Sequence, residues 1–195
     1  MKNMRGFTII ELLITVSIVG VLMGLAAPSF KRTIQSTTLA SSVNTFLADL
    51  RFARSEAVRL GGGVVMCRSE DPEGAALCAA TAGSGANGNG WVSGWIIFQD
   101  RDNDGARTAA TEPLLRIQAP NSSIDQILEG AGNSTRIRFT ATGRLLDAAS
   151  ATSLHFGGPR YTSDTQRVVC LSLGGRARIA GDGLTACGAG AEVNQ

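Results

Sequence analysis

The chain has 195 residues, which is long enough for a membrane segment and one globular domain and leaves little room for a second domain. Its formal net charge is only +2, so total charge gives no argument for binding nucleic acid or an anionic membrane, and any such argument depends on where the charges lie. Glycine is abundant at 24 residues and aromatic residues make up only 5%, which favours a β-rich domain with many turns over a helix bundle.

The N-terminus begins with a short basic leader. Residues 1–6 include Lys2 and Arg5 and no acidic side chain, and they precede an apolar run over residues 7–27 whose only charge is Glu11. A helix of this length crosses about 30 Å, the thickness of one hydrocarbon core. Because basic flanks stay in the cytoplasm, we expect a single pass through the inner membrane, with the rest of the chain in the periplasm.

An ordinary signal peptide is the alternative interpretation, because Ala26 and Ala27 could form a cleavage site behind an apolar core. The apolar run is, however, longer than such a core usually is. Glu11 also opposes it, since a carboxylate at mid-bilayer depth costs about 2.5 to 3.5 kcal/mol and needs a partner there. For Glu11 alone, snorkelling to the nearby headgroups is a further alternative.

The sequence GFTIIELL, residues 6–13, closely resembles the signature of type IV prepilins. The resemblance implies that prepilin peptidase cuts between Gly6 and Phe7, that the new amine is methylated, and that other pilins are partners in a filament. It also implies that Glu11 meets the positive N-terminus of a neighbouring subunit during assembly. The physics agrees, because an acid among packed helices needs a counter-charge such as the free Phe7 ammonium.

Apolar residues recur at three- and four-residue steps further along the chain, which predicts one stripe of an amphipathic helix. The stripe consists of Leu39, Val43, Phe46, Leu47, Leu50, Ala53, Ala57 and Leu60. Three glycines, Gly61 to Gly63, end this helix. We therefore predict one helix over residues 8–60, with a transmembrane or filament-core segment at 7–27, an amphipathic part at 28–60, and a β domain over residues 61–195.

Beyond residue 63 the pattern changes to short runs rich in β-branched and aromatic residues, which predict strands. The predicted strands are residues 64–68, 91–99, 114–118, 135–140, 144–146, 153–156, 167–173 and 176–180. Residues 69–90 are dense in Gly, Ala, Ser and Asn and predict a long loop. The predicted fold class is α+β, with the long N-terminal helix packed on an antiparallel β-sheet.

A long helix with a glycine-rich end, the run GWIIFQD at residues 94–100, an Asp/Asn/Gly turn and EPLLR at residues 112–116 together resemble the GspH/FimT family. The resemblance implies a type IV pilin-like fold. Its members are either minor pilins of type IV pili or pseudopilins at the tips of type II secretion pseudopili. His155 is the only histidine, and no catalytic arrangement accompanies it, so we do not expect an enzyme.

The four cysteines form two sequence-local pairs, Cys67 with Cys78 and Cys170 with Cys187, and lack the close CxxC spacing of zinc or thiol-exchange sites. We predict a disulfide in each pair, which requires an oxidising compartment such as the periplasm. Each would stabilise the fold by about 3 kcal/mol in the loop-entropy view. The alternative is that some of them stay free and buried.

The sequence DRDNDG at residues 100–105 matches the first half of a calcium loop, in which Asp100, Asp102 and Asp104 would turn their oxygens onto one ion. The second half is missing, because the twelfth position is Thr111 and Glu112 comes one residue late. A tight hairpin turn explains the same residues. We therefore predict neither a metal nor a cofactor.

Positive charge gathers near the C-terminus, where seven arginines face two acids between residues 136 and 178 and no lysine follows Lys31. Guanidiniums bind phosphate in a bidentate manner. The arginines are Arg136, Arg138, Arg144, Arg160, Arg167, Arg176 and Arg178. Two of them, Arg176 and Arg178, lie at i and i+2 of a predicted strand, so their side chains point to the same side about 7 Å apart.

The sequence Gly175-Arg176-Ala177-Arg178 also resembles the GRxR motif of FimT-type minor pilins that take up DNA. The resemblance implies capture of double-stranded DNA at a pilus tip during natural transformation. We predict that Gly175, Arg176 and Arg178 bind DNA, with Arg136, Arg138 and Arg144 as further contacts. Two alternatives remain open, namely arginines that merely cover an exposed strand and a type II secretion pseudopilin that binds only other pseudopilins.

Overall fold

The computed structural model of the chain describes residues 7–81, 85, 88–130, 135–147, 153–181 and 187, apart from the side chains of residues 25–28. The leader, residues 1–6, and with it the Gly6 side of the predicted cleavage site lie outside the described residues. Two compact units divide the chain, residues 1–37 and residues 38–195.

Helix α1 (Ile9–Leu60) is continuous over 52 residues, within one residue of the predicted helix. Thr8 and Glu11 form a capping box at its start: the Glu11 N–H donates to Thr8 Oγ1 at 3.3 Å, and the Thr8 N–H donates to Glu11 Oε2 at 3.4 Å. At its end Gly61 and Gly62 have φ of 80° and 113°. The Gly62 N–H donates to the Ala57 carbonyl at 2.7 Å, which closes the last turn.

The first unit consists of the N-terminal part of α1. Its large apolar side chains, such as Ile9, Leu12 and Val16, are about half exposed or more. The segment is long and apolar enough to cross a membrane by length and composition. Apolar surface of this extent needs lipid or packed helices around it.

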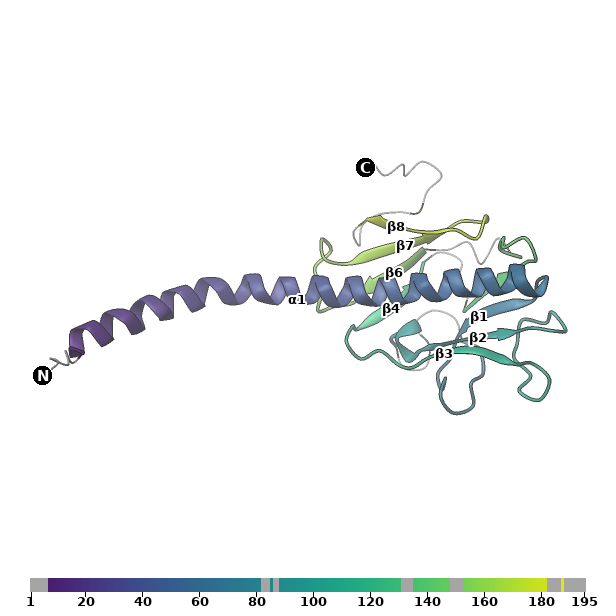
Figure 1. Cartoon of the computed structure of the whole chain (residues 1–195), viewed down its shortest axis with the longest axis horizontal. Coiled ribbons are helices and arrows are strands. Elements are labelled where there is room, and N and C mark those ends of the chain that lie inside the picture. The colour runs from purple at the N-terminus through teal and green to yellow at the C-terminus, as the bar shows by residue number, and fades with distance from the viewer. Residues whose placement is uncertain are drawn as a thin grey trace, which may run out of the picture. The chain divides into compact units, whose positions relative to one another are not determined.

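Two four-stranded antiparallel sheets make up the β domain (Figure 1). In spatial order the first sheet contains β3 (Leu114–Gln118), β2 (Trp95–Gln99), β1 (Val64–Arg68) and β5 (Arg136–Phe139). The second sheet contains β4 (Gln126–Glu129), β6 (Ser153–Gly157), β7 (Arg167–Leu171) and β8 (Ala177–Gly181). The strand β8 therefore lies at a sheet edge.

The predicted apolar stripe of α1 is the centre of the main core, which also takes side chains from both sheets. Phe46 contacts three rings in edge-to-face geometry, with centroid distances of 5.4 Å to Trp91, 5.1 Å to Trp95 and 5.5 Å to Phe156. Each fully buried large apolar side chain stabilises the fold by about 1.5 to 3 kcal/mol. The helix thus joins the two sheets, and the α+β prediction is confirmed.

A smaller core covers the other face of the first sheet. Val65 and Cys67 of β1 pack there with Ile96 and Phe98 of β2 and with Ala76 of the loop that follows β1. The Cys67–Cys78 disulfide joins this loop to the sheet, with a Cα–Cα distance of 5.4 Å. The disulfide therefore holds the first part of this loop, up to Cys78, against the sheet.

Three parts of the strand prediction were wrong. Trp91–Ser93 is a short 3-10 helix (η1) and not the start of β2, because Gly90 and Gly94 on either side have φ of 64° and 108°. Residues 144–146 form only an isolated bridge from Leu145 to Phe139. Strand β4 was missed, because its sequence QILE is short and half polar.

Candidate functional site

The hairpin of β7 and β8 carries the GRxR sequence. Ser172 to Gly175 form its turn, closed by hydrogen bonds from the Gly175 N–H to the Ser172 carbonyl at 2.8 Å and from the Ser172 N–H to the Arg176 carbonyl at 2.9 Å. Gly175 has a φ of 71°, and a Cβ placed on it would lie 2.1 Å from the Gly143 carbonyl oxygen. Only glycine fits there, for conformation and for space.

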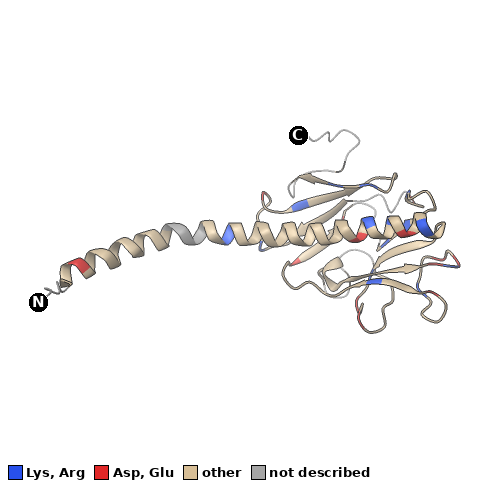
Figure 2. Ribbon diagram, in the orientation of Figure 1, with Lys and Arg blue, Asp and Glu red and all other residues tan. Residues whose placement is uncertain are grey.

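Arg176 and Arg178 are both exposed. Arg176 directly precedes β8 and Arg178 lies within it, and both line one groove of about 440 Å³ along the hairpin. Cys170 and Cys187 line the same groove, and their disulfide has a Cα–Cα distance of 5.5 Å. In Figure 2 the two strands of the hairpin carry basic residues and no acidic residue. The side chains of Arg176 and Arg178 thus lie on one surface, as their spacing predicts.

Two further arginines come close to the tip of this hairpin. Arg144 belongs to the turn whose Gly143 carbonyl meets Gly175, and the neighbouring Leu145 N–H donates to the Leu173 carbonyl at 3.0 Å. Arg54 of α1 packs on the same turn, since its Nε lies 2.9 Å from a Cβ placed on Gly143.

We call Arg54, Arg144, Arg176 and Arg178 the basic surface. Among the described residues, no carboxylate forms an ion pair with Arg54, Arg144 or Arg176. The sequence analysis did not predict Arg54 as a site residue, because a charged residue beside the apolar stripe of a helix usually faces solvent.

Arg136 and Arg138 are not brought to the hairpin. Both lie on β5, opposite Cys67 and Val65 of β1, on the face of the first sheet that carries the smaller core. The Arg138 guanidinium donates to the Asn103 carbonyl at 2.5 Å and forms ion pairs with Asp100 at 3.8 Å and Asp147 at 3.5 Å. Through these contacts Arg138 holds the loop between β2 and β3 in place.

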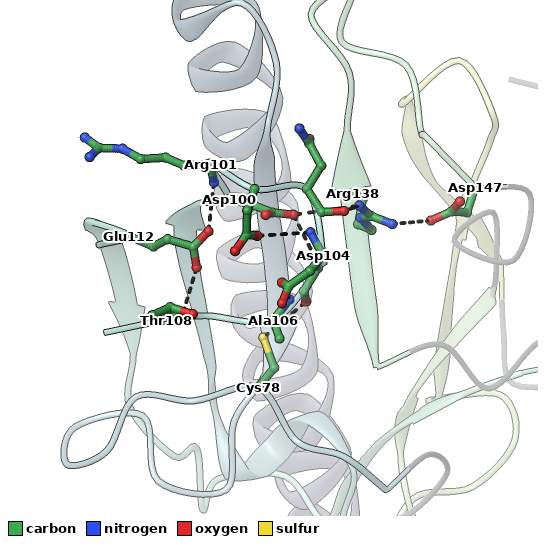
Figure 3. A network of polar contacts seen from close by, with 12 residues as sticks. Cys78, Asp100, Arg101, Asp104, Ala106, Thr108, Glu112, Arg138 and Asp147 are labelled. Carbon is green, nitrogen blue, oxygen red and sulfur yellow. Dashed lines mark hydrogen bonds and ion pairs between the residues drawn. The ribbon is translucent and has the colours of Figure 1, made fainter. Parts of the chain in front are cut away.

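The loop between β2 and β3 holds the predicted calcium-loop residues (Figure 3). Asp100 is 3% exposed, and its Oδ2 accepts from the Gly105 N–H at 3.0 Å. Glu112 is 2% exposed and accepts from the N–H groups of Arg101 at 2.8 Å and Thr108 at 2.7 Å.

One carboxylate oxygen each from Asp100, Asp102 and Glu112 lie within 4.8 Å of one another. Asp104, which the sequence placed in this set, instead accepts from the Ala106 N–H. Burial raises the pKa of the Asp100 carboxyl, and the negative charge of Glu112 raises this pKa further. The Gly105 N–H and Arg138 lower it, but the pKa stays above its ordinary value.

A buried ion pair joins the two sheets at β1 and β4, and sequence reasoning gave no sign of it. The side chains of Arg68 and Glu129 are both fully buried, 3.4 Å apart, and Glu129 also accepts from Trp91 Nε1 at 2.7 Å. The Arg68 guanidinium also donates to the Thr81 carbonyl. Burial raises the pKa of Glu129, while Arg68 and Trp91 lower it.

His155 lies on β6, where its Nε2 is 3.3 Å from Ser153 Oγ. Burial lowers the pKa of its imidazole. Ser153 is the described hydrogen-bond partner of the ring, and among the described residues no carboxylate contacts the imidazole to complete a catalytic relay, so His155 has the environment of a strand residue.

The processing and assembly residues lie at the start of α1. Phe7 is 76% exposed, and Glu11 is exposed on the first turn. The negative charge of Glu11 there also interacts favourably with the positive end of the helix dipole. In a single chain the hydrogen-bond partner of Glu11 is therefore its own helix end.

Comparison with known families matches two parts of the chain. The family described as type II transport protein GspH matches residues 42–175, and the prokaryotic N-terminal methylation motif matches residues 1–27. No curated protein and no solved structure matches the chain. The first match covers the stripe of α1 except Leu39, covers most of both sheets, and ends one residue before Arg176. The chain therefore belongs to the GspH family of type IV pilin-like proteins, which are structural pilins and pseudopilins.

Proposed function

We propose that the chain is a minor pilin of a type IV pilus that binds double-stranded DNA through the basic surface, for uptake in natural transformation. The observation that carries the proposal is that Arg176 and Arg178 are exposed and line one groove at a sheet edge. Arg54 and Arg144 extend the positive charge from the hairpin to α1.

The chemistry of the surface fits a phosphate backbone. Guanidiniums donate to phosphate oxygens in a bidentate fork, and each neutralised phosphate releases counterions. Gly175 lets the turn approach Gly143 closely, so the position of Arg176 is fixed by the fold. Arg144 and Arg54 would add contacts to neighbouring phosphates without reading sequence.

The route to the filament follows from the N-terminus. Prepilin peptidase would cut between Gly6 and Phe7, and the apolar part of α1 would hold the chain in the inner membrane before assembly with other pilins. The leader charges Lys2 and Arg5 favour a cytoplasmic N-terminus and a periplasmic β domain. The two disulfides agree with that compartment, since they require an oxidising environment.

The test is DNA binding by the full chain in detergent, measured by fluorescence anisotropy of a labelled duplex over a range of salt. Binding should be independent of sequence and should weaken as salt rises. Arg176→Ala with Arg178→Ala should lower affinity and make the slope of log K against log salt shallower by about 2, because two phosphate contacts are lost.

The control is Arg101→Ala with Arg160→Ala, which removes the same charge from two exposed loop residues away from the hairpin. This variant should keep a slope close to that of the native chain. Absence of binding at low salt, or an equal loss in the control, would contradict the proposal.

A type II secretion pseudopilin is the second candidate, and the match to type II transport protein GspH over residues 42–175 favours it. In that case the chain would contact other pseudopilins, and the arginines would be a solvated surface. Deletion of the gene would then stop secretion of a type II substrate. The double arginine variant would restore secretion fully in the deletion strain.

A further inference from the structure

The β2–β3 loop brings together a carboxylate set that differs from the one read from the sequence. One oxygen each of Asp100, Asp102 and Glu112 lie within 4.8 Å of one another. Two oxygens bound to one calcium ion at about 2.3 to 2.6 Å lie no more than about 5 Å apart. Glu112, one residue too late in a linear count, reaches the site because the loop folds back onto the Arg101 and Thr108 N–H groups.

A buried oxygen with no partner gives an independent indication of a ligand. Asp100 is 3% exposed, and its Oδ1 accepts no hydrogen bond from any residue that the structure describes. Leaving a buried carboxylate oxygen without a partner is costly, and such atoms commonly mark the place of an ion or a water. In Figure 3 the carboxylates of Asp100 and Glu112 point toward one another.

The nearby positive groups do not balance this charge. Arg138 is the ion-pair partner of Asp100, at 3.8 Å from its Oδ2, and it is shared with Asp147. Figure 3 shows the Arg101 guanidinium extended away from the carboxylates. Two buried carboxylates and the exposed Asp102 thus face one shared guanidinium, which leaves negative charge where burial is costly.

We propose that Asp100, Asp102 and Glu112 bind one calcium ion. The chemistry of the site favours this ion, because calcium takes carboxylate and carbonyl oxygens in flexible geometry, whereas magnesium demands a near-ideal octahedron. The ion would tie the β2–β3 loop to the end of α1, since the Asp100 N–H already donates to the Gly63 carbonyl at 2.7 Å.

The test uses the full chain in detergent, stripped of calcium with EGTA and then unfolded by heat. Calcium at about 1 mM would saturate a site with a Kd of about 10⁻⁴ M, as in extracellular modules, and should raise the Tm by about 3 °C or more. Calorimetric titration of the stripped chain with calcium should show one site. Magnesium at the same concentration should have a clearly smaller effect.

The main variant is Asp102→Asn, because Asp102 is exposed and an Asn Oδ1 can keep its hydrogen bond from the Asp104 N–H. It should fold normally and bind calcium at least about tenfold more weakly. Asp100→Asn should abolish binding. Glu73→Gln removes an exposed charge from another loop and should leave calcium binding unchanged. An unchanged Tm with calcium, native affinity in Asp102→Asn, or an equal response to magnesium would overturn the proposal.

Discussion

Asp49 is a carboxylate on the buried side of α1, 5% exposed, and its two oxygens connect the helix to the first sheet. One accepts from Trp95 Nε1 at 2.8 Å and the other from Arg116 Nη1 at 2.7 Å. The Arg116 guanidinium also lies 3.9 Å from the centre of the Phe52 ring. A polar residue in the core is thus satisfied at both oxygens, and it fixes how α1 lies on β2 and β3.

His155 makes stability depend on pH in a predictable direction. Burial lowers the pKa of its imidazole in the folded chain, below the ordinary value of 6.5. As pH falls, the imidazole of the unfolded chain is therefore protonated before that of the folded chain. The contribution of neutral His155 to folding stability is present above pH 6.5 and is lost as pH falls toward the lowered pKa. His155→Gln should lose less stability between pH 7.5 and pH 5.5 than the native chain does, as measured by urea midpoints.

The comparison isolates His155 because it is the only histidine in the chain. Asp100 and Glu129 have raised pKa values, which change stability with pH in the opposite sense, but both proteins share them. Equal pH dependence in the two proteins would show that the imidazole is as easily protonated in the folded state as in the unfolded state.

At the scale of elements, the turn between β7 and β8 depends on one glycine. Gly175→Ala would force a Cβ to within 2.1 Å of the Gly143 carbonyl and would strain a residue at φ 71°. We expect a loss of about 1 to 3 kcal/mol in the free energy of unfolding, measured in urea. If the basic surface binds DNA, the variant should also bind more weakly, although no charge is removed.

Gly174→Ala is the matched control for this prediction. The nearest atom to a Cβ placed on Gly174 is Ser172 Oγ at 3.7 Å, an ordinary contact. This variant should keep both native stability and native DNA affinity. A Gly175→Ala protein as stable as the native chain would mean that the turn can move away from Gly143 without cost.

Sequence periodicity was sufficient for the elements whose side chains alternate or repeat strongly. The stripe from Leu39 to Leu60 gave the helix, and residues 64–68 and 114–118 gave β1 and β3 with their bounds. It failed where backbone conformation decides. Gly90 and Gly94 break the run at residues 91–99, and a positive φ at a glycine leaves no trace in hydrophobic pattern.

The candidate sites were predictable to the extent that their residues are neighbours in the chain. Arg176 and Arg178 are two residues apart, so the strand period places them on one surface. Arg54 joins them only through the contact of Gly143 with Gly175, and Glu112 joins Asp100 only because the loop folds back. Contacts between distant segments depend on tertiary packing, which a single sequence does not display.

At the scale of the whole molecule, the exposed apolar surface of the N-terminal part of α1 requires a membrane or other helices around it. Large side chains from Phe7 to Met23 are mostly about half exposed or more, and such a surface persists only in a membrane or among packed helices. Within that surface Glu11 is the single charge. Among the residues that the structure describes, its partners are the N–H and the hydroxyl of Thr8, and no basic side chain forms an ion pair with it.

The role of Glu11 can be divided into its hydrogen bond and its charge. Glu11→Ala removes both, whereas Glu11→Gln keeps an acceptor for the Thr8 N–H and removes only the charge. If assembly needs an ion pair with the Phe7 ammonium of a neighbouring subunit, both variants should be cut by the peptidase after Gly6 and both should enter filaments poorly. Incorporation is measured by immunoblotting of sheared filaments, with Thr15→Ala as a control on the same exposed helix. Normal incorporation of Glu11→Gln beside failure of Glu11→Ala would assign the residue to capping the helix and would remove the ion pair from the assembly mechanism.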